Sequence, residues 1–207
     1  PGLPLISIDI ANGLFPQRQE DVEVAPAVGA TLGYNARRGD LVGGIELDLM
    51  MLSAEADKDF ARVDPGDIPE FEGVLTQTRY QTEIDGLATL RLRAGIASGR
   101  SLFYGTAGLA AGKIRNRFSL ALDDGPFAAA PYRNSWSDSG TRFGFVIGAG
   151  FEQWLNETAS FKAEILHFDL EDVTVRAEDP GTFGGNTIAY RFRNEGQVLR
   201  LGLNFRF

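Results

Sequence analysis

The 207-residue sequence contains no cysteine, a single histidine (His167), and no apolar run long enough for a membrane-spanning helix. Without cysteine, the chain has neither a disulfide framework nor thiolate chemistry. The net charge of −8 and the lack of a basic stripe argue against a nucleic-acid partner. A membrane location stays open, because each strand of a membrane barrel carries only about ten residues of alternating pattern.

The end of the chain shows the pattern that recurs throughout it. Every second position there is large and apolar: Leu199, Leu201, Leu203, Phe205 and Phe207. The positions between them hold Arg200, Gly202, Asn204 and Arg206. A period of two indicates a strand with one apolar and one polar face. We predict that the apolar face meets lipid and that the polar face meets a narrow, filled lumen.

Similar alternation elsewhere predicts eight strands. They cover residues 6–10, 27–34, 43–51, 84–97, 101–122, 142–152 and 161–165, and a last stretch that ends at 207. The glycine- and alanine-rich strand at 101–122 leaves open which of its faces points outward.

The connections between these strands alternate in length. Long polar breaks at residues 54–78, 123–139 and 178–186 follow short turns near Gly39, Gly99 and Asn156. This pattern favours an all-β, eight-stranded antiparallel up-and-down transmembrane β-barrel with short periplasmic turns and long extracellular loops. An even strand number puts both termini on the periplasmic side. We expect residues 1–207 to form this single outer-membrane β-barrel domain, beginning as a mature or trimmed product would.

Several short segments resemble the eight-stranded outer-membrane β-barrel family of Gram-negative bacteria, porin-like surface antigens related to the OmpA transmembrane domain. The resemblance rests on residues 90–95, 148–152, 162–164, 169–170 and 201–207. It implies a location in the Gram-negative cell outer membrane, contact with outer-membrane lipids and lipopolysaccharide, and no cofactor. It also implies that Leu203, Phe205 and Phe207 form the signal read by the outer-membrane assembly machinery.

The chain departs from that family at two points. Ile165 and His167 stand where the family often has tyrosines, which puts one part of an aromatic interface girdle in doubt. The chain also stops at the last strand, so we expect no peptidoglycan-binding domain and no wall-anchoring role.

Charged residues on the predicted inward faces are balanced in sign. They are Glu46, Asp48, Glu152 and Glu164 against Arg91, Arg93, Lys162 and Arg200. Strand neighbours should bring Glu46 and Asp48 to the two arginines at 91 and 93, Glu152 to Lys162, and Glu164 to Arg200. One reading is an ion-selective pore, and the other is a salt-bridge network that plugs the barrel. We favour the plug, because an eight-stranded barrel is only wide enough for its own side chains.

Acidic residues crowd the predicted outer loops. They are Glu55, Asp57, Asp59, Asp64, Asp67, Glu70, Glu72, Asp123, Asp124, Glu178 and Asp179. Such oxygens could hold divalent cations, but no calcium-loop spacing is present, so we favour solvated loops and predict no metal site. A protein partner could bind through these loops.

His167 raises the question of catalysis, with Ser160 and Asp169 near it in sequence. Because a triad is recognised by geometry and not by sequence proximity, we predict that the chain is not an enzyme. The preferred function is a non-enzymatic outer-membrane barrel with a structural, surface-interaction or accessory-subunit role. A narrow porin-like channel is the alternative. A soluble lipocalin-like carrier, with the apolar face turned inward, is a third.

Overall fold

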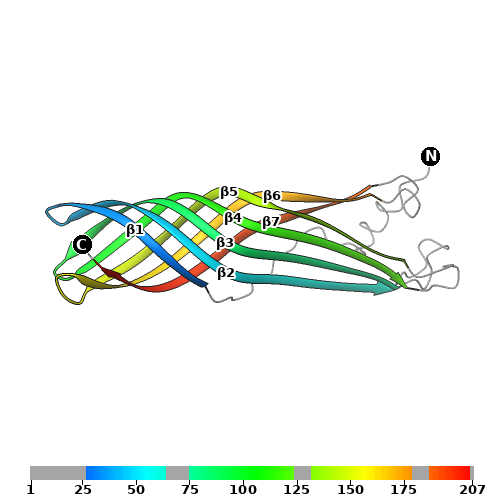
Figure 1. Ribbon diagram of the computed structural model, residues 1–207, viewed down its shortest axis with the longest axis horizontal. Helices are drawn as coiled ribbons and strands as arrows, with labels where there is room; N and C mark the ends of the chain where they lie inside the picture. Colours follow the sequence, from blue (N-terminus) through cyan, green and yellow to red (C-terminus); the bar gives the residue numbers. More distant parts are fainter. Residues whose placement is uncertain (1–26, 64–74, 124–131, 179–186, 206–207) are drawn as a thin grey trace.

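The structure is a computed structural model that describes residues 27–63, 75–123, 132–178 and 187–205. These residues form one antiparallel sheet of seven strands in chain order (Figure 1). The strands are β1 (Ala27–Arg38), β2 (Leu41–Val63), β3 (Leu75–Ser98), β4 (Ser101–Asp123), β5 (Tyr132–Trp154), β6 (Ala159–Glu178) and β7 (Thr187–Phe205). The strand predicted at 6–10 lies outside the described residues. Within them the sheet is not closed, since β1 pairs only with β2 and β7 only with β6.

Short turns join β1 to β2, β3 to β4 and β5 to β6 at one end of the molecule (Figure 1). Gly39 and Gly99 each begin a two-residue turn with a positive φ, of 63° and 59°. A glycine at that position suits the hairpin turns that follow the twist of the flanking strands. In the third turn the Asn156 side chain accepts hydrogen bonds from the Thr158 and Ala159 amides. We call the part of the barrel near these turns the turn-side half, and the rest the far half.

Most of the strands are much longer than the sequence pattern predicts, whereas β4 agrees with the strand predicted at 101–122. β2, β3, β4 and β5 contain 23, 24, 23 and 23 residues, whereas a tilted strand needs only about 9–11 residues to cross a bilayer. The predicted long breaks at 54–78 and 123–139 are therefore wrong over most of their length. β2 continues to Val63, β3 starts at Leu75 and β5 starts at Tyr132.

In the turn-side half, apolar side chains point outward and polar ones inward. Leu90, Ile147 and Leu201 are 47%, 51% and 70% exposed, whereas Arg91 and Glu152 are 0% and 3% exposed. A lipocalin-like carrier requires the opposite arrangement, so that alternative does not fit this half. We call these outward apolar side chains the apolar band. It ends where charged residues take the outward positions, at Glu55, Asp85, Lys113, Asp169 and Glu195.

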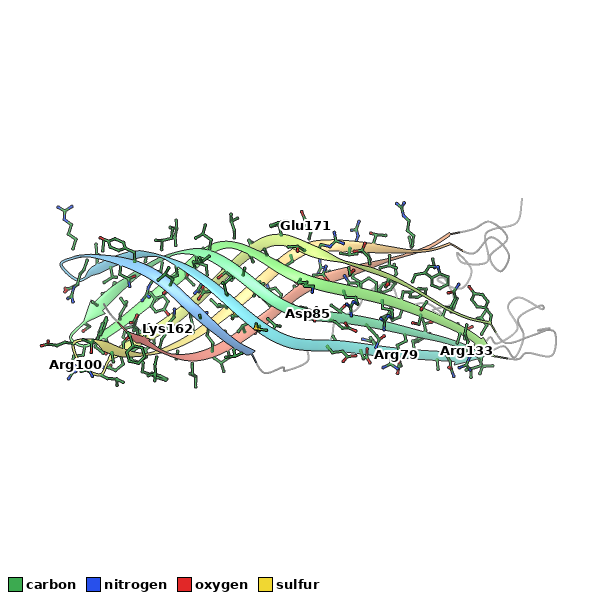
Figure 2. The ribbon with its side chains drawn as sticks, in the orientation of Figure 1. Arg79, Asp85, Arg100, Arg133, Lys162 and Glu171 are labelled. Atoms are coloured by element: carbon green, nitrogen blue, oxygen red, sulfur yellow. The ribbon has the colours of Figure 1, made fainter. Side chains whose placement is uncertain are left out.

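The far half reverses this arrangement. Its outward face carries ion pairs such as Arg79 with Asp57 and Arg115 with Glu83 (Arg79 is labelled in Figure 2). Its interior is an aromatic and aliphatic cluster made by Tyr80, Phe118, Leu120, Val173, Val175, Ala177, Tyr190 and Phe192. Apolar residues inside and charges outside are the arrangement of a sheet that faces water.

β-bulges lie near the boundary between the two halves. The register shifts between Met51 and Ala54, between Ile84 and Gly86, and between Leu170 and Val173. Along β3 and β6 the alternation of facing residues changes phase there, since Ile84 and Leu87 both face inward, as do Leu170 and Val173; β2 keeps its phase.

The far half is also forked. β2, β3, β4 and β5 stay paired along its length, but β5 pairs with β6 only up to Gly144 and Leu170. Beyond that point β6 and β7 form a separate two-stranded hairpin, whose ends diverge from those of β2, β3 and β4 in Figure 1. The aromatic cluster packs between this hairpin and the four-stranded part.

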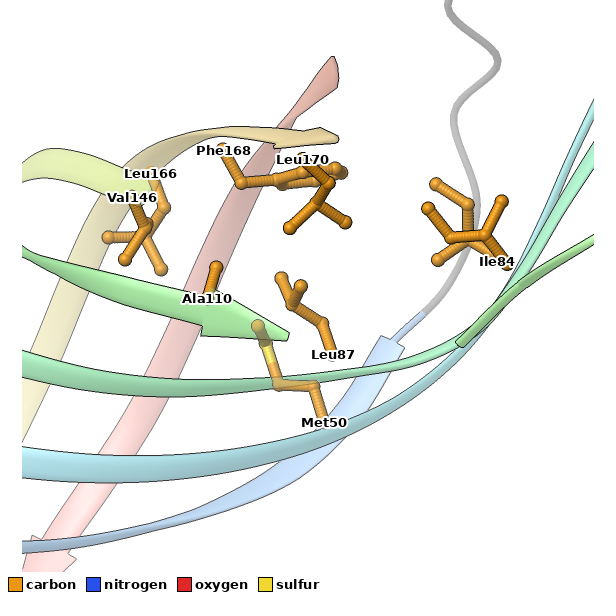
Figure 3. Packing of buried hydrophobic residues seen from close by; sticks show 9 residues of the cluster. Met50, Ile84, Leu87, Ala110, Val146, Leu166, Phe168 and Leu170 are labelled. Carbon is orange, nitrogen blue, oxygen red and sulfur yellow. The ribbon is translucent and has the colours of Figure 1, made fainter. Parts of the chain in front are cut away.

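Between the two halves the lumen is filled by apolar side chains from five strands (Figure 3). They are Met50, Ile84, Leu87, Ala110, Ile114, Val146, Leu166, Phe168 and Leu170. A smaller cluster of Ala97, Leu102 and Tyr104, with Val42 against it, lies near the turns. The polar interior described next lies between these two apolar layers.

None of the described residues forms a helix that is long and apolar enough to cross a membrane.

Candidate functional site

Arg91 is the centre of a buried ion-pair network in the turn-side half. β3 directs it into the lumen between β2 and the more distant β6. Its Nε donates to Asp48 Oδ2 at 2.8 Å, Nη1 to Glu164 Oε1 at 3.0 Å, and Nη2 to Glu46 Oε2 at 2.9 Å. One guanidinium thus contacts three carboxylates on two strands that are not neighbours, and links opposite walls of the barrel.

Glu46 connects this centre to two further cations. Its Oε1 accepts from Arg93 Nη1 at 2.7 Å and from Lys162 Nζ at 3.0 Å. Lys162, labelled in Figure 2, also lies 3.6 Å from Glu164 Oε1. Glu46 therefore contacts three cations, counting Arg91, and its charge is fully surrounded.

Arg200 of β7 contributes the fourth cation. Its Nη1 donates to Asp48 Oδ1 at 2.8 Å, and its guanidinium also contacts Glu164. Hydroxyl groups complete the shell of Asp48, which accepts from Thr31 at 2.6 Å and from Thr89 at 2.9 Å. At 17% side-chain exposure, Arg200 is the least buried of the eight charged groups.

Glu152 lies at the edge of the network nearest the turns. It accepts a hydrogen bond from Arg93 Nη2 at 2.8 Å, from Asn204 Nδ2 at 3.2 Å and from the Ser160 hydroxyl. Glu152 and Lys162 are register partners on β5 and β6, yet no ion pair joins them. The predicted Glu152–Lys162 pair is thus replaced by a longer reach to Arg93, while the Lys162 ammonium turns towards Glu46.

The structure brings all eight predicted inward charges together and adds Tyr104, which the sequence did not single out. Its hydroxyl donates to Glu164 Oε1 at 3.0 Å, and the Arg93 guanidinium lies 3.9 Å from its ring centroid. Tyr104 pairs in register with Gly95 on one side and Gly150 on the other. A Cβ at Gly150 would overlap the Tyr104 ring, so these glycines make room for it. The sequence alone does not show this relation, because it depends on the register that places Tyr104 between Gly95 and Gly150.

The network is electrically neutral, with four carboxylates and four cations. Seven of the eight groups are almost completely buried, and Arg200 is partly so. A charge taken out of water is stable only when it is paired and its remaining donors and acceptors are hydrogen-bonded. Here each carboxylate contacts at least one cation as well as a second donor. The arrangement binds charges to each other, and offers no acid, base or nucleophile to a substrate.

The remaining predicted features lie elsewhere. Leu203 and Phe205 are exposed on the outward face of β7, while Phe207 lies outside the described residues, so the assembly signal stays a prediction. Ser160 faces the lumen, whereas His167 and Asp169 are on the outward face of the same strand. These three residues therefore do not form a catalytic triad.

Of the acidic residues predicted in loops, some lie on strands and the others lie outside the described residues. Glu55, Asp57 and Asp59 are on β2 itself, which corrects their loop assignment, and Asp123 and Glu178 end β4 and β6. Asp64, Asp67, Glu70, Glu72, Asp124 and Asp179 lie outside the described residues. Across the described ranges, no group of three or more His, Asp or Glu side chains could hold a metal ion.

Over residues 6–207 the chain matches the family described as outer membrane protein beta-barrel domain. The chain belongs to this family. The predicted fold class and family are confirmed, as this match agrees with an all-β antiparallel sheet whose outward face is apolar in its turn-side half.

Named relatives of this outer-membrane barrel are outer-membrane proteins of other bacteria. The 31 kDa outer-membrane immunogenic proteins of Brucella melitensis biotype 1 and Brucella suis biovar 1 are each 30% identical over 212 residues, covering 98% of this chain and 81% of theirs. A 22 kDa outer membrane protein of Rhizobium leguminosarum bv. viciae is 26% identical over 175 residues, covering 84% of this chain and 63% of that protein. No solved structure matches the chain.

Proposed function

We propose that this protein is a non-enzymatic barrel of the cell outer membrane whose lumen is closed by the ion-pair network around Arg91. The network carries the proposal because it is neutral, buried and cross-linked between opposite walls. An ion that entered would have to displace a carboxylate or a cation from its partners. Breaking one such buried pair costs about 3–5 kcal/mol.

The layers on either side of the network support the same function. Ala97, Leu102 and Tyr104 close the lumen near the turns, and the cluster shown in Figure 3 fills it beyond the network. A permeant ion would also lose its hydration at these apolar layers. The barrel then serves as a rigid support for its far half, which extends beyond the apolar band.

The long far half suits a structural, surface-interaction or accessory-subunit role. Strands of 23 or 24 residues extend well beyond the apolar band. With the short turns in the periplasm, as the alternating connection lengths predict, both termini are periplasmic and the far half is extracellular. A protein partner would bind there, the membrane half would contact lipid and lipopolysaccharide, and the assembly machinery would read Leu203, Phe205 and Phe207.

A narrow porin-like channel is the alternative, and one observation favours it. A hollow of about 1750 Å³ lies along β1 and β7, bordered by polar residues that include Thr31, Asn35 and Asn204. Closing the described sheet would require a further strand between β1 and β7, along this hollow. The two functions therefore differ in whether a continuous aqueous path remains beside the network.

Single-channel recording in planar bilayers tests the proposal. We expect the refolded wild-type protein to insert without stepwise conductance. The charge-balanced Arg91→Ala/Glu164→Ala variant removes two large side chains from the plug and should show brief openings. Refolding is checked by heat-modifiable gel mobility for both proteins. Reproducible conductance steps from the wild-type protein would establish the channel function and rule out a closed lumen.

A further inference from the structure

Beyond Leu170, β6 is paired on one side only. Within the described part of the chain, positions 173–178 pair with β7, and pairing with β5 ends at Gly144 and Leu170. In an antiparallel strand every second residue directs its N–H and C=O groups to the same edge, so the edge of β6 that faces away from β7 carries backbone groups without a ladder partner. Such an edge is a template for a further strand. We call residues 172–177 the β6 edge.

The side chains of the β6 edge alternate between two faces. Val173 and Val175 are buried in the aromatic cluster, whereas Asp172, Thr174 and Arg176 occupy successive outward positions and are exposed. Natural edge strands are commonly protected from pairing by a proline or by a charge that points inward. Residues 172–177 contain neither, so this edge is suited to accept a strand.

The outward charges of the β6 edge are weakly paired within the chain. The Asp172 side chain is 42% exposed, and its ion-pair partner, Arg191 of β7, lies 4.0 Å away. Arg176 has no ion pair with any described residue. One anion and one cation are thus free to meet charges on a partner strand.

The order of these residues makes the β6 edge complementary to a second copy of itself. When two such edges run antiparallel with Thr174 opposite Thr174, Asp172 of each copy lies opposite Arg176 of the other. The same register places Val173 opposite Val175 on the inward face. Opposite charges and β-branched side chains directly across from each other both stabilise antiparallel sheets.

Other pairings of two β6 edges lose this complementarity. Moving the antiparallel register by two residues sets Asp172 opposite Thr174 or Glu178, and moving it by one residue turns the apolar side chains to the outward face. Parallel pairing in register sets Arg176 against Arg176 and Asp172 against Asp172, and like charges directly opposite are destabilising. The sequence of the edge therefore selects the antiparallel arrangement.

An antiparallel arrangement fixes how the two barrels face each other. β6 begins at the turn-side end of the molecule and ends at the opposite end, where Figure 1 shows its hairpin with β7. Two copies joined along antiparallel β6 edges have their far halves side by side and their turn-side halves at opposite ends. Because each turn-side half carries an apolar band, the two copies belong to two membranes that face each other.

We propose that the β6 edge pairs with the β6 edge of a second copy of this chain in a facing membrane. The two hairpins then form one four-stranded sheet, in the order β7–β6–β6–β7, with each Asp172 paired to the Arg176 of the other copy. The inference rests on the proposed surface-interaction role and deepens it by naming the partner and the contact. It does not depend on whether the lumen conducts.

The test holds one refolded barrel in each lipid nanodisc and measures the pairing of discs by analytical ultracentrifugation over a range of concentrations. Two discs are joined only when their barrels face each other, so pairing within one membrane does not contribute. The variants are Asp172→Arg and Arg176→Asp, each of which leaves two like charges on the β6 edge. The matched control is Arg193→Asp, which reverses an exposed outward cation on β7.

We expect wild-type discs to pair, and each single variant to pair with itself about tenfold more weakly or less, since both cross-strand pairs change from opposite to like charge. Mixing the two single variants should restore wild-type pairing, because opposite charges then meet at both positions. Wild-type discs that stay separate overturn the inference. A mixture that pairs no better than either variant alone also overturns it, and so does an equal loss in Arg193→Asp.

The register is tested by a disulfide, since the chain has no cysteine of its own. Thr174→Cys places two thiols opposite each other across the pair, within reach of a disulfide, and copper-catalysed oxidation by oxygen should join two discs. Ala189→Cys, at an exposed position of β7, is the control and should leave the discs separate. Cross-linking of Thr174→Cys only in discs that hold two barrels would show pairing within one membrane and overturn the facing arrangement. Heat-modifiable gel mobility confirms folding in every case, so failure of this pairing is distinguishable from failure of the closed lumen, which the conductance recording tests.

Discussion

Replacing Arg91 with methionine tests the central claim about the lumen. The substitution keeps an unbranched apolar stem but removes the guanidinium group and its hydrogen bonds of 2.8, 3.0 and 2.9 Å to Asp48, Glu164 and Glu46. It leaves four buried carboxylates facing three cations. Loss of one member of a buried ionic network costs about 3–5 kcal/mol, chiefly because the remaining charges lose their compensation.

Equilibrium unfolding in urea, in lipid vesicles and followed by heat-modifiable gel mobility, measures this loss. With m-values of about 1–3 kcal/mol/M, a change of 3–5 kcal/mol lowers the urea midpoint by roughly 1–5 M. The double variant Arg91→Met/Glu164→Gln restores neutrality and should recover part of the loss, with a coupling energy of about 0.5–3 kcal/mol.

The control is Arg193→Met, which removes an exposed arginine whose partner, Glu195, lies 3.5 Å away. Surface substitutions of this kind change stability by only about 0.5 kcal/mol or less. If Arg91→Met proves as mild as Arg193→Met, the lumen charges are hydrated and the plug does not exist.

Three further predictions follow from the layers of the barrel. Burial in the far half raises the pKa of Tyr190 to about 12 from an ordinary value of 10.0, so its contribution to stability is present below pH 10 and lost as pH rises to 12. Comparing wild type with Tyr190→Phe by phenolate absorbance and unfolding across that range checks this, and a normal tyrosine titration would contradict it. Gly150→Ala should push the Tyr104 ring away from its position and cost about 1–3 kcal/mol, whereas Gly202→Ala, with open space around it, should be nearly neutral in the same urea assay. Leu92→Arg should cost about 2–4 kcal/mol in vesicles if Leu92 faces lipid, and Leu92→Gln should cost less; equal stability of wild type and both variants would place this face in water.

The turn-side half was largely predictable from sequence. Alternation assigned the outward and inward faces of the strands around Glu46, Arg91 and Arg200, and their order along the chain implied which charges could meet. The actual partners were not predictable, because long side chains cross a narrow lumen and reach strands that are not neighbours. Arg91 of β3 contacts Glu164 of β6, three strands further along the chain, and Glu152 pairs with Arg93 instead of its register partner Lys162.

Outside β4, which the sequence predicted over almost its full length, the far half was missed for a different reason. The stretch around Asp57 and Asp59 is highly charged and leads into turn-forming residues, and both features predict a loop. The strands do continue there, but their surroundings change, so the inward side chains become apolar, as at Tyr80 and Phe118, and the outward ones charged. On β3 and β6, bulges also change the phase of the alternation near that boundary, so a period-two pattern does not continue across it.

The hairpin at the far end of β6 and β7 has a consequence for how the molecule loosens. Between Val173 and Phe192 it is joined to the rest of the described sheet by side-chain packing, without ladder hydrogen bonds across the gap to β5. Regions held in this way open at lower free energy than the fully paired strands. Warming should therefore release deuterium-exchange protection in this arm first, at temperatures where the turn-side half is still fully protected.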